Sequence, residues 1–81
     1  MEDTLQKTYH FKDFKRIYEV YNTARQYPFD VDAKHDTYTV DCKSLMGLLS
    51  LNTQKPIDIV LHTDDKKLAQ ELFQKIDLIV A

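Results

Sequence analysis

The sequence contains little glycine, proline or cysteine, and each shortage excludes a class of protein. One glycine and two prolines among 81 residues exclude a collagen-like or linker-rich chain. Hydrophobic residues make up 43% of the chain, with five tyrosines and four phenylalanines, so disorder is not expected either. The only cysteine, Cys42, cannot form an intramolecular disulfide. These shortages favour a folded protein in a reducing compartment, and we expect a cytoplasmic location.

The chain also lacks long apolar runs and a strong excess of charge of one sign. No stretch approaches the ~20 apolar residues of a membrane span, and the polar start MEDTLQKT does not look like a secretory signal. Eleven basic residues against thirteen acidic ones give a net charge of −2, which provides no basic field for nucleic acid or anionic lipid. We therefore expect neither direct nucleic-acid binding nor membrane association.

Length limits what the fold can do. A chain of 81 residues is short for one domain, so residues 1–81 are expected to form a single unit. Such a unit has little room for a deep catalytic pocket, which favours a binding or carrier module over an enzyme. The histidines His10, His35 and His62 fall in different predicted elements without helical pairing, so neither a metal site nor a cofactor is expected.

Hydrophobic spacing predicts the order of the elements. Alternating residues predict strands over 4–9, 29–34, 37–41 and 57–62. Apolar residues at helical spacing predict a helix capped by Asp13 and ending near Gln26, a short one capped by Ser44, and a third opened by Asp64 or Asp65. The order β-α-β-β-α-β-α predicts an α+β fold, with a four-stranded antiparallel sheet and three helices on one face. The residues expected in its core include Ile17, Val31, Ile59, Leu68 and Leu72.

The segment over 41–61, DCKSLMGLLSLNTQKPIDIVL, resembles the middle of the HPr family of phosphocarrier proteins. The most specific part is KSLMGLLSL over 43–51, and the shared element order extends the resemblance over nearly the whole chain. The resemblance implies an open-faced β-sandwich and two sites. One is a histidine before the first helix, in a sequence like GLHTRPA, which takes phosphate from enzyme I. The other, in Gram-positive types, is a serine at the start of the second helix that a dedicated kinase phosphorylates.

Only one of these sites carries over to the chain. An ungapped alignment of the first helix puts Asp13 where the family has its histidine, Lys15 where it has arginine and Arg16 where it has proline. The acceptor motif is therefore missing. The serine, by contrast, maps onto Ser44 within an intact KSLMG segment. HPr-like proteins that lack the histidine and keep the serine act in carbon-catabolite regulation, so the resemblance implies that Ser44 is phosphorylated.

The expected partner surface surrounds these positions. Lys12, Lys15 and Arg16 either form a solvated face or meet an acidic partner, since the equivalent edge of HPr contacts its partners. A two-turn helix cannot bury all of its leucine and methionine side chains on one side, so some of them are expected in a docking surface. That surface is predicted to include Leu45, Met46 and Leu49, with Lys43 placed to pair with a phosphate on Ser44.

Three interpretations stay open. The first is a non-enzymatic HPr-like regulator or adaptor, switched at Ser44, whose partners are an HPr-type kinase, a transcriptional regulator or phosphotransferase components. The second is a phosphocarrier of the sugar phosphotransferase system in which His10 replaces the missing histidine. The third is a plain protein-interaction module. The sequence does not define an oligomeric state.

Overall fold

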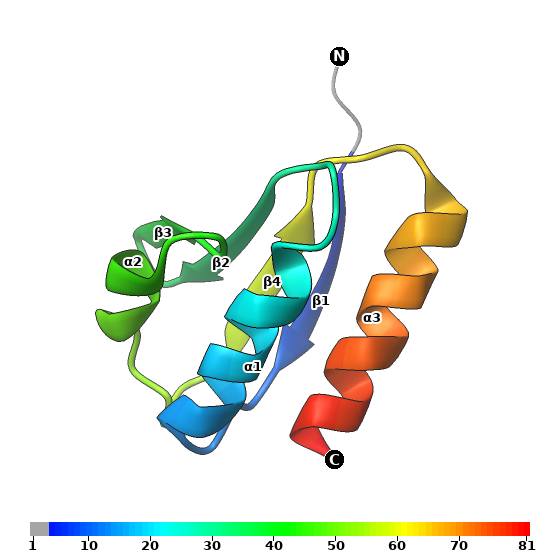
Figure 1. Cartoon of the computed structure of the whole chain (residues 1–81). Helices are drawn as coiled ribbons and strands as arrows, with labels where there is room; N and C mark the ends of the chain where they lie inside the picture. Colours follow the sequence, from blue (N-terminus) through cyan, green and yellow to red (C-terminus); the bar gives the residue numbers. More distant parts are fainter. Residues whose placement is uncertain (1–3) are drawn as a thin grey trace.

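The computed structural model describes residues 4–81, which form four strands and three helices in the predicted order (Figure 1). The strands are β1 (Leu5–Tyr9), β2 (Val31–His35), β3 (Tyr38–Asp41) and β4 (Ile57–Leu61). The helices are α1 (Phe14–Ala24), α2 (Leu45–Leu49) and α3 (Lys66–Val80). The predicted boundaries of the strands differ from the observed ones by at most two residues.

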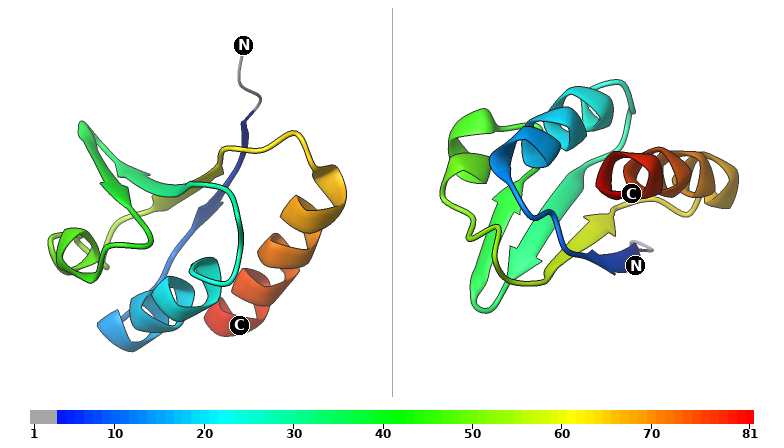
Figure 2. Two further views of the ribbon diagram at one scale, coloured as in Figure 1. Left: turned by 45° about the horizontal axis from the view of Figure 1, so that its top comes forward. Right: turned by 90° about the horizontal axis from the view of Figure 1, so that it is seen from below.

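The strands form one sheet in the order β1-β4-β2-β3, and every neighbouring pair is antiparallel. All three helices lie on the same face of this sheet, and its other face is not covered by a helix (Figure 2). This arrangement confirms the predicted α+β fold, an open-faced β-sandwich. Strands β1 and β3 form its two edges.

The core lies between the sheet and the helices. The strand residues that point towards the helices alternate with polar ones in β2 and, except at Val60, in β4. Ile17, Val31, Ile59 and Leu72 are buried as expected. Leu68 is only partly buried, because it lies in the first turn of α3 at the rim of the core, so its predicted burial was wrong.

Side-chain caps fix where the helices begin. Asp65 accepts a hydrogen bond from the Leu68 backbone N–H at 3.1 Å, which identifies Asp65 rather than Asp64 as the cap of α3. Helix α1 ends at Ala24, two residues before the predicted end, because the Gln26 N–H turns back to the Thr23 carbonyl. None of the described helices combines the length and the apolar character that crossing a membrane requires.

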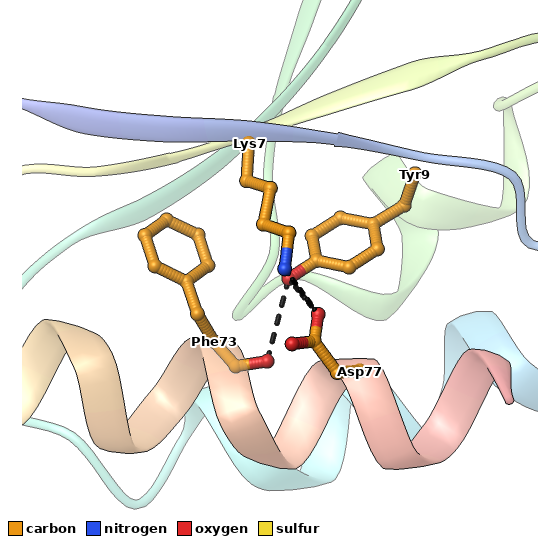
Figure 3. Close-up of polar contacts among 4 residues, drawn as sticks. All are labelled: Lys7, Tyr9, Phe73 and Asp77. Carbon is orange, nitrogen blue, oxygen red and sulfur yellow. Dashed lines mark hydrogen bonds and ion pairs between the residues drawn. The ribbon is translucent and has the colours of Figure 1, made fainter.

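A polar cluster joins the edge strand β1 to α3 (Figure 3). The Tyr9 hydroxyl donates to Asp77 Oδ1 at 2.8 Å and to the Phe73 carbonyl oxygen at 3.3 Å. Lys7 Nζ lies 2.7 Å from the same Asp77 oxygen. The hydrogen bond from Lys7, supported by that from Tyr9, lowers the pKa of Asp77, whereas burial and the nearby Asp77 raise the pKa of Tyr9. The cluster therefore holds the C-terminal half of α3 against β1.

Candidate functional site at the starts of α1 and α2

The start of α1 is shaped by a sharp turn at Lys12. Its φ of 64° lies in the left-handed region, which costs a non-glycine residue roughly 1–2 kcal/mol. The Asp13 N–H closes the turn on the Phe11 carbonyl at 2.6 Å. Phe11 is fully buried and anchors the turn in the core. The turn therefore sets Asp13 at the first position before the helix.

Asp13 acts as a helix cap in this position. Its Oδ1 accepts a hydrogen bond from the Arg16 backbone N–H at 3.1 Å, and its Oδ2 pairs with Arg16 Nη1 at 2.6 Å. Both carboxylate oxygens are thus engaged by the first turn of α1. The carboxylate lies at the free backbone N–H groups of the helix start, which a phosphate group would otherwise bind. Its negative charge also repels an approaching phosphate.

Ser44 caps the short helix α2 in the same manner. Its hydroxyl oxygen accepts a hydrogen bond from the Gly47 N–H at 3.4 Å. Gly47 lies close to β3, since a Cβ at this position would come within 3.3 Å of Val40 Cβ. A larger residue at this position would need Val40 or α2 to shift by a few tenths of an ångström. The long cap bond is weak, and it leaves the half-buried Ser44 hydroxyl without a strong partner.

Lys43 makes contacts that the sequence did not indicate. Its ammonium donates to the Tyr27 carbonyl oxygen at 2.6 Å, and its backbone N–H donates to Asp41 Oδ1 at 2.8 Å. Tyr27 is buried and its hydroxyl donates to Glu71 Oε1 at 2.9 Å. Lys43 thus ties the start of α2 to the turn after α1. Its pairing with a phosphate on Ser44 stays a prediction, and it requires the ammonium to leave Tyr27.

The apolar side chains of α2 are divided between the core and the surface, as expected for a helix of this length. Leu48 is buried, and Leu45 is half-buried. Met46 and Leu49 are 83% and 60% exposed. Exposed apolar side chains of this size next to one another are typical of a contact surface, and methionine adapts its shape to different partners.

Two aromatic residues on α1 were missed by the sequence reasoning. Phe14 and Tyr18 are 39% and 43% exposed, and α1 packs directly against α2. They lie four residues apart, so they share one face of α1, outside the buried stripe of Ile17, Val20 and Ala24. That second apolar spacing was the signal in the sequence. We define the docking patch as Phe14, Tyr18, Met46 and Leu49.

The predicted basic residues at the start of α1 are not equivalent. Lys12 and Lys15 are exposed and make no ion pair with any residue that the structure describes. Arg16 is half-buried and bound to Asp13, so its guanidinium is partly occupied. The two lysines, not Arg16, therefore supply the available positive charge at this end of α1.

The histidines and the cysteine are placed apart from one another. His10 is exposed, and within residues 4–81 it makes no hydrogen bond or ion pair. His35 lies 3.3 Å from Asp36, and His62 lies 2.7 Å from Asp32. Among the described residues, no group of three metal-binding side chains comes together. Cys42 is a buried core residue, and burial raises the pKa of its thiol.

Comparison with known proteins identifies the family. A family model described as the PTS HPr component phosphorylation site matches residues 16–81. The chain belongs to the HPr family. HPr proteins are phosphocarriers rather than enzymes, and they interact with other proteins of the phosphotransferase system. The match begins at Arg16, so Asp13 and Lys15 lie outside it.

Solved structures show the same fold. A phosphocarrier protein HPr from Bacillus anthracis str. Ames superposes with a TM-score of 0.74 at 22% identity, over 96% of this chain and 98% of that one. HPr-C-His from Thermoanaerobacter tengcongensis superposes with a TM-score of 0.70 at 19% identity, over 94% of each chain. A search of curated proteins for relatives in sequence gave no match. The HPr fold is therefore conserved in a chain that differs from these two at most positions.

Proposed function

We propose that this protein is a regulatory or adaptor member of the HPr family that does not carry phosphate between enzymes. In this proposal residues 1–81 form one cytoplasmic HPr domain, and its role is regulation of the carbon-catabolite type. Ser44 is the residue that a kinase modifies. The docking patch, Lys12 and Lys15 bind the partner, which is an HPr-type kinase, a transcriptional regulator or another phosphotransferase component.

The main observation against phosphoryl transfer is that Arg16 binds the carboxylate of Asp13. Transfer through a family histidine needs a nucleophilic nitrogen beside donors that hold the incoming phosphate. At the aligned position this chain has a carboxylate, and Arg16 binds both of its oxygens. His10 lies three residues before the aligned position and forms no side-chain hydrogen bond or ion pair within residues 4–81, so the proposal gives it no role in transfer.

Ser44 supports the regulatory half of the proposal. Its hydroxyl lies at the start of α2 in a weak cap bond, two residues before the exposed Met46. A phosphate there adds up to about two negative charges at the start of a helix that exposes Met46 and Leu49. The change alters which partner fits the docking patch, without requiring the domain to refold.

A transfer assay tests the loss of the carrier activity. The protein is incubated with enzyme I and phosphoenolpyruvate, with a histidine-containing HPr in the same tube as the positive control. We expect the HPr to become labelled and this protein to stay unlabelled. An acid-labile phosphate on this protein that disappears in the His10→Ala variant would overturn the proposal and identify a phosphocarrier.

A further inference from the structure

A groove in the described part of the molecule lies between the edge strand β1 and α3. It has a volume of about 490 Å³. Its floor is apolar and is formed by Leu5, Ala69 and Phe73. Figure 3 shows Phe73 beside β1, next to the cluster of Lys7, Tyr9 and Asp77. None of the residues assigned to the proposed function lines this groove.

The groove has the dimensions of an extended peptide. It is lined along α3 from Lys66 to Asp77, which at 1.5 Å per residue is about 16 Å of helix. That length accommodates about five residues of a strand at ~3.3 Å each. Strand β1 borders the groove as an edge of the sheet, since it pairs only with β4. The backbone groups on its outer side are therefore available to a further strand.

Glutamine side chains with no hydrogen-bond partner among the described residues lie at the rim of the groove. Gln70 and Gln74, both on α3, line it, and neither makes a side-chain hydrogen bond with any residue that the structure describes. A glutamine amide offers both donors and acceptors, so it matches the backbone of a peptide in either direction. An apolar floor, an open strand edge and free amides together favour an extended peptide over a compact ligand.

The charges differ between the two ends of the groove. At one end Lys7 and Asp77 neutralise one another at 2.7 Å. At the other end Lys66 forms no ion pair within residues 4–81, and it also borders a smaller adjoining hollow with Thr4 and Asp64. Among the described residues that line the groove itself, Lys66 is the charge without an opposite partner, and Asp64 lies in the adjoining hollow. An acidic side chain complements Lys66.

We propose that this groove binds an extended acidic segment of a partner protein, which adds as a strand beside β1 with an acidic residue next to Lys66. Its alternate apolar side chains cover Leu5 and Phe73, which are partly exposed. A second copy of this chain fits less well. β1, Leu5–Tyr9, contains no acidic residue, so a symmetric pairing of two β1 edges places no carboxylate from that strand beside Lys66.

Two synthetic peptides of about eight residues test this proposal, each alternating valine with threonine so that one face is apolar. One ends in two glutamates and the other in two lysines. Each is titrated into the full-length, ¹⁵N-labelled protein while amide shifts are recorded by NMR. We expect saturable shifts around Leu5, Gln70 and Phe73 with the glutamate peptide, and about threefold or weaker binding of the lysine peptide.

Two matched variants test the role of the charge. Lys66→Glu should reverse the preference between the peptides, whereas Lys67→Glu, one residue outside the groove lining, should keep it. Absence of saturable shifts in the groove, or equal binding of both peptides, would overturn the proposal. Dimerisation of the protein alone, with shifts at β1 that depend on its own concentration, would assign the groove to a second copy and also overturn it.

Discussion

The Lys43 ammonium donates a hydrogen bond to the Tyr27 carbonyl oxygen at 2.6 Å, and so joins the start of α2 to the turn that follows α1. The bond is partly buried, and its donor is charged. Hydrogen bonds with one charged partner contribute roughly 1.5–3 kcal/mol to the free energy of unfolding. Lys43 therefore has a structural role next to the proposed phosphorylation site.

Lys43→Met tests this role, because methionine keeps much of the side-chain length and removes the donor. We expect the free energy of unfolding to fall by about 1–2 kcal/mol, measured by urea denaturation. The control is Lys67→Met on the exposed side of α3, which should change stability by less than about 0.5 kcal/mol. Equal effects of the two substitutions would show that the Tyr27 contact contributes nothing specific.

The cap at Asp13 gives a second prediction. Asp13→Ala removes the acceptor of the Arg16 N–H and should destabilise the fold by about 1 kcal/mol. Asp64→Ala is the control, because Asp64 is exposed and directly precedes the cap residue Asp65 without being the cap itself. A cost for Asp64→Ala as large as that for Asp13→Ala would contradict the assignment of Asp13 as a structural cap.

The contacts of Asp77 with Lys7 and Tyr9 predict that the stability of the fold depends on pH. The pKa of Asp77 is lowered in the folded state, so its contribution is present above the unfolded pKa of about 3.9 and is lost as the pH falls through the folded value. Asp77→Asn should therefore lose less stability than the wild type between pH 7 and about pH 3. Urea midpoints at both pH values measure this, and an identical acid loss in the two proteins would refute it.

Local patterns in the sequence were enough to predict most of the fold. The caps Asp13 and Ser44 depend on contacts within three residues, and strand alternation fixed which side of β2 and β4 enters the core. Contacts between residues far apart in the sequence could not be predicted from local patterns. Val60 follows Ile59 on the opposite face of β4, where alternation predicts exposure, yet it is buried between its strand neighbours Gln6 and Asp32.

The candidate site was predictable only in part for the same reason. The excess of apolar side chains in α2 could be counted against its length, which correctly predicted exposed residues such as Met46. The Lys43 contact with Tyr27 spans sixteen residues and has no local signal. Phe14 and Tyr18 had such a signal in their spacing of four, but the buried stripe of the same helix was the stronger pattern.

The docking patch gives a prediction about recognition by the kinase. Met46→Ala and Leu49→Ala should each lower kcat/KM for phosphorylation by an HPr-type kinase by about fivefold or more, as expected for a contact residue worth over ~1 kcal/mol. Stability should change by less than about 0.5 kcal/mol, since both side chains are exposed. The matched control is Leu78→Ala on α3, which is also exposed, at 78%. A similar loss for Leu78→Ala would argue against a patch on α1 and α2.

The most direct test of the regulatory account is the intact mass of the protein after treatment with ATP and an HPr-type kinase, with a histidine-containing HPr in the same tube. Ser50 lies at the other end of α2, where its hydroxyl donates to the Gly47 carbonyl, so Ser50→Ala is the matched control. We predict that the wild type and Ser50→Ala each gain one phosphate and that Ser44→Ala gains none. An unmodified wild type beside a modified HPr, or a phosphate that persists in Ser44→Ala, would contradict the assignment of Ser44 as the switch.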